Sequence, residues 1–376
     1  MKNSLYIVLV IILFSCKWQT KEQSLLINGK QQIAINSVDS IIVDARNMSL
    51  SGFWVTDGRY LYYKDNNIVT IKKYSPDGIE CERYFSRGRG PEEMLRPPLA
   101  FKRFDNGDYI YIDYDSQFFY FDSLMNKKWT YNFYKVGEQS GTVFRRNLYN
   151  NPDPNEVLMY ELSSNENQVE LLGDNIIFPV TTEHIKYNGF YKKSRAKEFY
   201  KYSYHLMALN KNTFKKEIFG KFPSKYHKHM WSNFMDCHIT KDDSLLYVSF
   251  EADHKIYVYN KDLKLVSSFG VKVENIESSY PERYTFEEAT NNQKKDRETH
   301  GFYSSIYFIN DYLFRIYHTK YNKIGMQVYS DRKLISDKII NYEIFEFIGY
   351  IKPYYYVNTK CDIDKEVYII TKIFIK

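Results

Sequence analysis

Cysteine is scarce in this sequence, with 4 residues among 376. Apart from Cys16 in the leader, Cys81, Cys237 and Cys361 form an odd set without a CxxC pair or any other metal-type spacing. At most one disulfide can form among them, and a zinc centre built on cysteine is excluded. Because free cysteine behaves as a small apolar residue, we expect three buried thiols, with a single bridge as the alternative.

Long hydrophobic runs are also absent. The longest apolar run, 5–14, has about ten residues, whereas a membrane-spanning helix needs roughly 20. A basic start, this run and the small residue Ser15 have the layout of a signal peptide over residues 1–15. The segment Leu13-Phe14-Ser15-Cys16 resembles the bacterial lipobox, which implies cleavage before Cys16 and acylation of its thiol. An ordinary signal peptide cut near Ser15 is the alternative.

The leader also predicts where the protein resides. Acyl chains on Cys16 would each contribute about 0.8 kcal/mol per buried CH₂, so the membrane is the first expected partner. Residues 16–37 contain few apolar side chains and are predicted to form a flexible tether. Because no acidic run follows Cys16, we expect an outer-membrane lipoprotein of the cell envelope that faces the periplasm.

Blocks of like charge and common catalytic motifs are missing. The net charge of +6 is modest, and basic and acidic residues alternate along the chain, so nucleic acid is not an expected partner. The sequence has no Gly-x-Ser-x-Gly elbow, no His-Glu-x-x-His motif and no phosphate-binding loop. We therefore predict no cofactor, name no catalytic residue, and leave open whether the protein is an enzyme.

Short runs rich in Ile, Val, Tyr and Phe are abundant from residue 38 onward, and clusters of Asp, Asn, Gly and Lys separate them. This pattern predicts strands joined by tight turns. The best helical patterns, 192–201 and 282–298, are charged and are predicted to be insertions. Aromatic residues make up 18% of the chain, which fits either a sugar-stacking surface or simply strand preference combined with AT-rich codon usage.

A degenerate unit of strand, polar turn and strand recurs along the chain, which predicts a repeat fold. Its clearest copies are 60–85, 109–133 and 245–269, and weaker copies are 176–220, 307–340 and 349–376. Six units of this size predict an all-β protein with a six-bladed β-propeller over residues 38–376. A strand at 38–44 would complete the last blade and close the ring. A pair of β-sandwiches is the alternative, but it does not explain the repeat.

The segment between the first two clear copies carries a specific resemblance. It reads Arg87-Gly88-Arg89-Gly90-Pro91-Glu92-Glu93-Met94, with a proline pair at 97–98, and the next copy supplies Asp113, Asp115 and Asp122. This resembles the Gly-x-Gly-Pro-Gly-Glu signature of the TolB-like, six-bladed propeller lipoproteins of Bacteroidetes, although Glu92 stands where the third glycine is usual. The resemblance implies a propeller and an envelope location, and it names no substrate.

Two interpretations of this segment remain open. In the structural one, the glycines and Pro91 form a tight turn between blades, which Arg87 and Arg89 lock by pairing with Glu93. In the functional one, Arg87 and Arg89 lie at one mouth of the channel and, with Glu93, contribute to a ligand-binding site for an anionic group.

Metal binding has one candidate set, which consists of His227, His229 and His238 with nearby carboxylates at 236, 242 and 243. Two imidazoles on alternate residues of a strand could share an ion. Because residues 223–231 have the composition of a loop, solvated histidines are the favoured interpretation, and we predict no metal site.

The leading functional hypothesis is a non-enzymatic, membrane-anchored propeller that binds a protein, peptide or glycan partner in the cell envelope. The alternative is a propeller-type lyase or hydrolase that acts on polysaccharide or peptide. A third possibility is a structural accessory protein without a small-molecule site.

Overall fold

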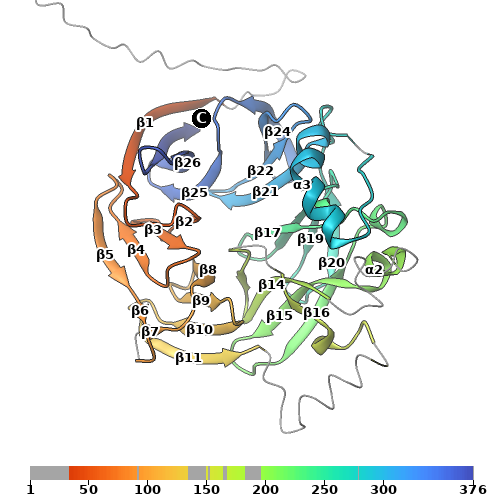
Figure 1. Cartoon of the computed structure of the whole chain (residues 1–376), viewed down its shortest axis with the longest axis horizontal. Helices are drawn as coiled ribbons and strands as arrows, with labels where there is room; N and C mark the ends of the chain where they lie inside the picture. Colours follow the sequence, from red (N-terminus) through yellow and green to blue (C-terminus); the bar gives the residue numbers. More distant parts are fainter. Residues whose placement is uncertain are drawn as a thin grey trace, which may run out of the picture.

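The computed structural model of the protein describes residues 34–375 apart from 91–92, 134–149, 151–152, 164–166, 183–195 and 278. Within these residues, strands form six antiparallel sheets that are arranged as blades around one axis (Figure 1). The predicted six-bladed β-propeller is therefore confirmed, and the pair of sandwiches is excluded. The predicted signal peptide at 1–15 and Cys16 lie outside the described residues.

In blades 1 to 5 the chain runs from the innermost to the outermost strand. Blades 1 and 2 consist of β2 (Gly52–Thr56), β3 (Leu61–Asp65), β4 (Ile71–Tyr74) and β5 (Glu80–Tyr84), then β8 (Pro98–Arg103), β9 (Tyr109–Asp113), β10 (Gln117–Phe121) and β11 (Lys127–Asn132). Blade 3 consists of β12 (Glu161–Leu162), β13 (Glu170–Leu172), β14 (Asn175–Thr181), β15 (Tyr204–Asn210) and β16 (Lys216–Lys221). Blade 4 consists of β17 (Cys237–Lys241), β18 (Leu246–Phe250), β19 (Ile256–Tyr259) and β20 (Leu265–Phe269). Blade 5 consists of β21 (Phe302–Ile309), β22 (Tyr312–His318), β23 (Ile324–Ser330) and β24 (Lys333–Ile340).

Blade 6 closes the ring by joining the two ends of the described chain. Its inner strands β25 (Glu346–Ile351), β26 (Tyr354–Asp362) and β27 (Val367–Ile375) come from the C-terminal region, and its outermost strand is β1 (Ile35–Asp44). The register of β1 and β27 runs from Ile35 opposite Ile375 to Asp44 opposite Val367. The predicted closing strand is confirmed, and it begins at Ile35, before the predicted boundary at 38. Closure in this way gives blade 6 a full set of four strands and ties the two ends of the described chain together by backbone hydrogen bonds.

The hydrophobic core is divided into wedges between neighbouring blades. One cluster, for example, packs Ile110 and Phe118 of blade 2 against Ile176 and Met207 of blade 3. Equivalent clusters join blades 1 and 2, 3 and 4, 4 and 5, 5 and 6, and 6 and 1. Aromatic and β-branched side chains suit these flat interfaces, which accounts for much of the high aromatic content.

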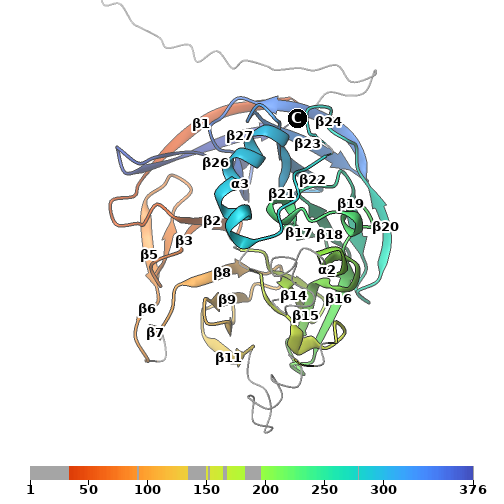
Figure 2. The same ribbon diagram turned by 45° about the vertical axis from the view of Figure 1, so that its right-hand side comes forward.

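Antiparallel order places the segments between blades and the turns between each second and third strand on the same face of the ring, called the linker face here. This face carries α2 (Ala196–Tyr202) and α3 (Phe286–His300), so both predicted helical insertions are present (Figure 2). Three short 3₁₀ helices, η1 (Val157–Met159), η3 (Tyr226–Lys228) and η4 (Ser232–Phe234), also lie in linkers. None of the helices in the described residues has both the length and the apolar composition of a membrane span.

The three cysteines of the propeller are all free. Cys237 is buried, Cys361 is half-buried and Cys81 is exposed on β5. The expectation of three buried thiols is therefore right for Cys237 and wrong for Cys81, because β5 is an outermost strand whose side chains mostly face solvent.

Candidate functional site

The inner strands of the blades enclose a central channel with a cavity of about 680 Å³. Strands β2, β8, β17, β21 and β25 supply side chains to it, and blade 3 contributes through residues near β13. Its lining mixes aromatic rings such as Phe53 and Phe347 with hydroxyl and amide groups such as Ser305 and Asn358. The volume lies in the range of small-molecule binding sites, roughly 300 to 1,000 Å³.

The inner strand of blade 3 is split into β12 and β13, and the residues just before β13 link the neighbouring blades. The Asn167 side-chain oxygen accepts a hydrogen bond from the backbone N–H of Phe101 in β8, at 3.0 Å. The Gln168 side-chain oxygen accepts one from the backbone N–H of Ile239 in β17, at 2.8 Å. Each of these two amide side chains therefore satisfies one backbone N–H on the inner edge of a neighbouring blade, and both side chains line the channel.

Three of the inner strands also contain irregular positions that change which side chains face the channel. The register shifts between Pro98 and Ala100 in β8, between Tyr303 and Ser305 in β21, and between Phe347 and Gly349 in β25. A bulge re-aims the side chains beside it. In β21 the irregular position falls at Ser304, and both Ser304 and Ser305 are among the residues that line the cavity.

Charged groups stand at both ends of the channel, and each has a partner. Toward the face opposite the linker face, the Lys102 ammonium lies 2.6 Å from the carboxylate of Glu170, which is 4% exposed. Burial raises the pKa of Glu170 above its ordinary value, although Lys102 opposes this effect. Toward the linker face, the Asn358 amide donates to the Glu346 carboxylate at 3.0 Å. Loss of hydration inside the channel raises the pKa of Glu346, although the hydrogen bond from Asn358 opposes this effect.

A buried ion pair ties α3 to the linker-face end of the channel. Arg297 of α3 donates two hydrogen bonds to Glu251, at 2.8 and 2.9 Å, and the His238 ring lies 3.9 Å from the same carboxylate. Burial disfavours the charged form of Glu251, but Arg297 and His238 outweigh it and hold the pKa of Glu251 below its usual value. The Phe302 ring lies between the Arg297 guanidinium and the His318 imidazole, at 4.3 and 4.9 Å.

Two histidines, His238 and His318, line the cavity at this end. The ring nitrogen Nε2 of His238 has no hydrogen-bond partner in the described part of the chain. Burial, assisted by the positive charge of Arg297, lowers the pKa of His318 and keeps its imidazole neutral. His238 belongs to the candidate metal set identified from the sequence, whereas His318 has no sequence signal that identified it.

The segment that carries the family resemblance lies at the outer edge of the ring (Figure 1). Ser86–Arg87 (β6) and Glu93–Met94 (β7) form a short parallel pair, and Arg87 and Arg89 are exposed. Glu93 accepts a hydrogen bond from the backbone N–H of Gly90 at 2.6 Å, and no ion pair joins it to either arginine among the described residues. The predicted ion-pair lock and the placement at a channel mouth are wrong, because β6 and β7 extend outward from the blades. Ligand binding at this outer position stays a prediction.

The aspartates that follow this segment order turns. Asp113 accepts from the backbone N–H of Gln117 at 2.8 Å, Asp115 pairs with Arg96 at 2.9 Å, and Asp122 accepts from the backbone of the turn after β10. The resemblance therefore marks the connection between blades 1 and 2, and none of these three residues lines the channel.

The three histidines that formed the candidate metal set do not come together. The His227 ring lies 3.0 Å from the carbonyl of Phe222, and His229 stacks on Trp231 beside Glu282. Of these three histidines, only His238 lines the channel. Within the residues that the structure describes, no group of three or more His, Cys, Asp or Glu side chains is arranged to hold a metal ion.

Comparison with known proteins identifies the fold but not the function. No known protein family profile and no curated protein matches the sequence. A solved structure of a DUF4221 family member from Bacteroides vulgatus is similar to this chain, with a TM-score of 0.66 and 13% identity over 92% of this chain and 98% of that chain. A Bacteroides fragilis protein named as a candidate for export has a TM-score of 0.58 and 12% identity over 94% and 98% of the two chains. The predicted likeness to propeller proteins of Bacteroidetes is thus confirmed for the fold alone.

Proposed function

We propose that the protein is a lipid-anchored, TolB-like propeller of the cell envelope that binds a protein, peptide or glycan partner through its channel without catalysing a reaction. The leader at 1–15, the lipobox-like segment and Cys16 support the anchor. The similarity to a Bacteroides fragilis protein named as a candidate for export fits an envelope location. The membrane is then one partner, and the channel receives the other.

The observation that carries this proposal is the channel lining. The buried acid groups Glu170 and Glu251 are already neutralised by Lys102 and Arg297 within the protein. The cavity of about 680 Å³ also contains Arg103, Glu343 and Glu346, each of which has a partner within the protein, and the rest of its lining offers aromatic rings, amides and hydroxyl groups such as Ser305. Such a surface suits a polar, largely uncharged ligand, such as a sugar unit or a peptide segment, because rings stack while amides and hydroxyls exchange hydrogen bonds.

A second function, catalysis by a lyase or hydrolase, is favoured by one feature of the same cavity. Two imidazoles, His238 and His318, and the Glu346 carboxyl line it, and the pKa values of His318 and Glu346 are shifted. Groups with shifted pKa values in a cleft are typical of acid–base chemistry on a polysaccharide or peptide.

The binding proposal is tested by native mass spectrometry of the protein purified from its own envelope, with Ser305→Trp and Ser268→Trp variants. Ser305 lines the channel, whereas Ser268 is exposed on the outermost strand of blade 4. We expect the unmodified protein and Ser268→Trp to retain a bound molecule, and Ser305→Trp to lose it. Equal retention by both variants would place the bound molecule elsewhere.

Catalysis makes a different prediction for the same sample. If the bound molecule is a substrate, it is consumed on incubation with fresh protein, and His238→Ala or Glu346→Gln abolishes the consumption. If it is a partner, it stays intact. The two functions are therefore separated by whether the molecule changes, and not by whether it binds.

A further inference from the structure

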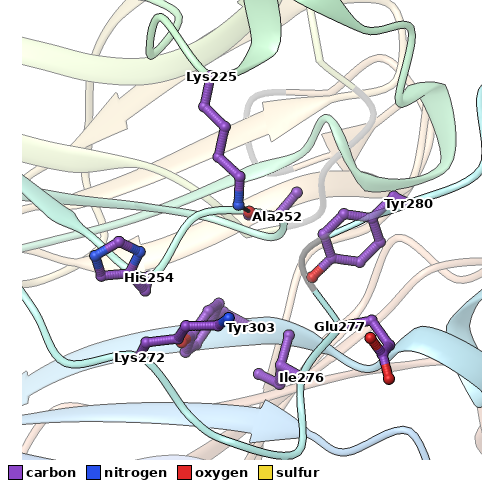
Figure 3. Close-up of a pocket in the computed structure, with 8 residues that line it drawn as sticks. All are labelled: Lys225, Ala252, His254, Lys272, Ile276, Glu277, Tyr280 and Tyr303. Atoms are coloured by element: carbon purple, nitrogen blue, oxygen red, sulfur yellow. Dashed lines mark hydrogen bonds between the residues drawn. The ribbon is translucent and has the colours of Figure 1, made fainter.

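A second hollow lies on the linker face where blades 4 and 5 meet (Figure 3). Its volume is about 240 Å³, and it shares no lining residue with the channel. Its walls come from the loop after β16, the turn between β18 and β19, the linker after β20 and the start of β21. The pocket is lined by Lys225, Ala252, His254, Lys272, Ile276, Glu277, Tyr280 and Tyr303.

The floor of this pocket is rigid. Tyr303 is 2% exposed, and the guanidinium of the fully buried Arg315 lies 3.5 Å from the centre of its ring. Arg315 also donates hydrogen bonds to the carbonyl oxygens of Asp253 and His254, both at 2.5 Å. One buried side chain therefore fixes both the ring at the floor and the turn that forms one wall, so the pocket is preformed.

The charges around the pocket are predominantly positive. Lys225 donates to the carbonyl oxygen of Ala252 at 2.7 Å, which leaves two donors on its ammonium group. Lys272 is exposed at the rim and has no ion pair in the described part of the chain. The carboxylate among the lining residues, Glu277, is engaged by Lys320 at 3.0 Å. Two ammonium groups are thus available above apolar walls.

A hydroxyl group with no partner faces the same space. The Tyr280 side chain is 5% exposed, and its oxygen has no hydrogen-bond partner in the described part of the chain. Figure 3 shows that this hydroxyl and the ammonium groups of Lys225 and Lys272 point toward one another across the pocket. A buried hydroxyl without a partner costs free energy, and an acceptor atom placed between these three groups would remove that cost.

We propose that this pocket binds a small organic acid, with its carboxylate held by Lys225, Lys272 and the Tyr280 hydroxyl and its apolar body against Ile276 and Tyr303. The apolar walls cannot donate hydrogen bonds to an inorganic anion, which needs such bonds on every side. The volume is below that of a pocket for a drug-sized ligand, so the body is about as large as one side chain. A free carboxylic acid and the C-terminal residue of a peptide both present this chemistry.

Calorimetric titration of the full protein with phenylacetate tests the site. We expect phenylacetate to bind, and phenylacetamide, which has the same body without the charge, to bind at least tenfold more weakly. The peptide Gly-Gly-Phe and its C-terminal amide then identify the source: binding of the free peptide alone assigns a C-terminus, and failure of both peptides assigns a free acid.

Matched variants locate the binding. Lys272→Gln and Tyr280→Phe should each weaken phenylacetate binding about tenfold, because each removes a hydrogen bond to a charged acceptor. Lys228→Gln and Tyr321→Phe change exposed residues of the linker face outside the pocket and should have no effect. The proposal is overturned if phenylacetate does not bind below about 10 mM, if the amide or inorganic phosphate binds equally well, or if pocket and control variants behave alike.

Discussion

At the scale of single residues, His205 of β15 shows how burial controls an ionisable group in this propeller. It is 1% exposed, and the rings of Phe222 and Phe250 lie against it. Burial lowers the pKa of its imidazole from 6.5 to about 3. Below pH 6.5 the unfolded chain therefore takes up a proton that the folded protein resists, and stability is lost progressively as the pH falls toward 3.

This titration predicts a measurable loss of stability in mild acid. Between pH 7 and pH 4.5, His205 should lower the free energy of unfolding by about 2 to 3 kcal/mol. Urea unfolding of the unmodified protein and of His205→Leu at both pH values isolates the contribution, because the other titrating groups are common to both. If the two proteins lose the same free energy, His205 is not responsible.

Glu93 provides a second prediction at this scale. Its carboxylate accepts a hydrogen bond from Gly90 at 2.6 Å, and a Cβ atom at Gly88 would collide with it. We therefore expect Glu93→Ala to lower the free energy of unfolding by about 1 to 2 kcal/mol. Arg89→Ala, which changes an exposed residue of the same turn, should alter it by less than about 0.5 kcal/mol. A neutral Glu93→Ala in denaturant unfolding would remove the structural interpretation of this segment.

At the scale of elements, β1 links the ends of the described chain, and its two faces differ in how far their side chains are buried. Ile41 is 7% exposed in the wedge between blades 6 and 1, whereas Ile42 on the opposite face is 68% exposed. Ile41→Ala should cost about 2 to 4 kcal/mol, and Ile42→Ala less than about 0.5 kcal/mol. Denaturant unfolding of both variants measures the difference. Equal costs would mean that β1 does not seal the ring.

The helix α3 is held by the buried ion pair between Arg297 and Glu251, besides a second pair between Arg283 and Asp296. Replacing Arg297 with Met leaves the Glu251 carboxylate buried without its partner and should destabilise the protein by about 3 to 5 kcal/mol. The double variant Arg297→Met/Glu251→Leu should recover most of the loss, because it removes the unpaired charge. Lys294→Ala in the same helix, where the lysine is 89% exposed, is the control. Thermal unfolding of all three variants tests this account, and it fails if the double variant is no more stable than the single one.

At the scale of the whole molecule, the fold was predictable because the propeller repeats its outer strands with the same composition. The units at 60–85 and 245–269 correspond to β3–β5 and β18–β20, and 38–44 falls within β1. The innermost strands were not recognised. Strands such as β2 and β17 are short and carry mixed side chains, since their inner edges face the channel instead of a neighbouring strand.

The candidate site was not predictable for the same reason. The channel is assembled from residues far apart in sequence, such as Lys102, Glu170 and His238, and each comes from a different blade. Only the ring geometry brings these residues together, and their spacing in the sequence does not reveal that they are neighbours. The glycine-rich signature is distinctive in sequence, yet it lies at the outer edge of the ring, where the chain makes a tight turn between blades 1 and 2.

The central claim, that the channel receives a partner in the cell envelope, is tested most directly by photo-crosslinking in living cells. A photoreactive amino acid is placed at Ser305 inside the channel and, in a separate strain, at Ser268 on the outermost strand of blade 4. Our account predicts a discrete adduct from position 305 that is absent from position 268. No adduct at position 305, or the same adduct from both positions, would contradict it.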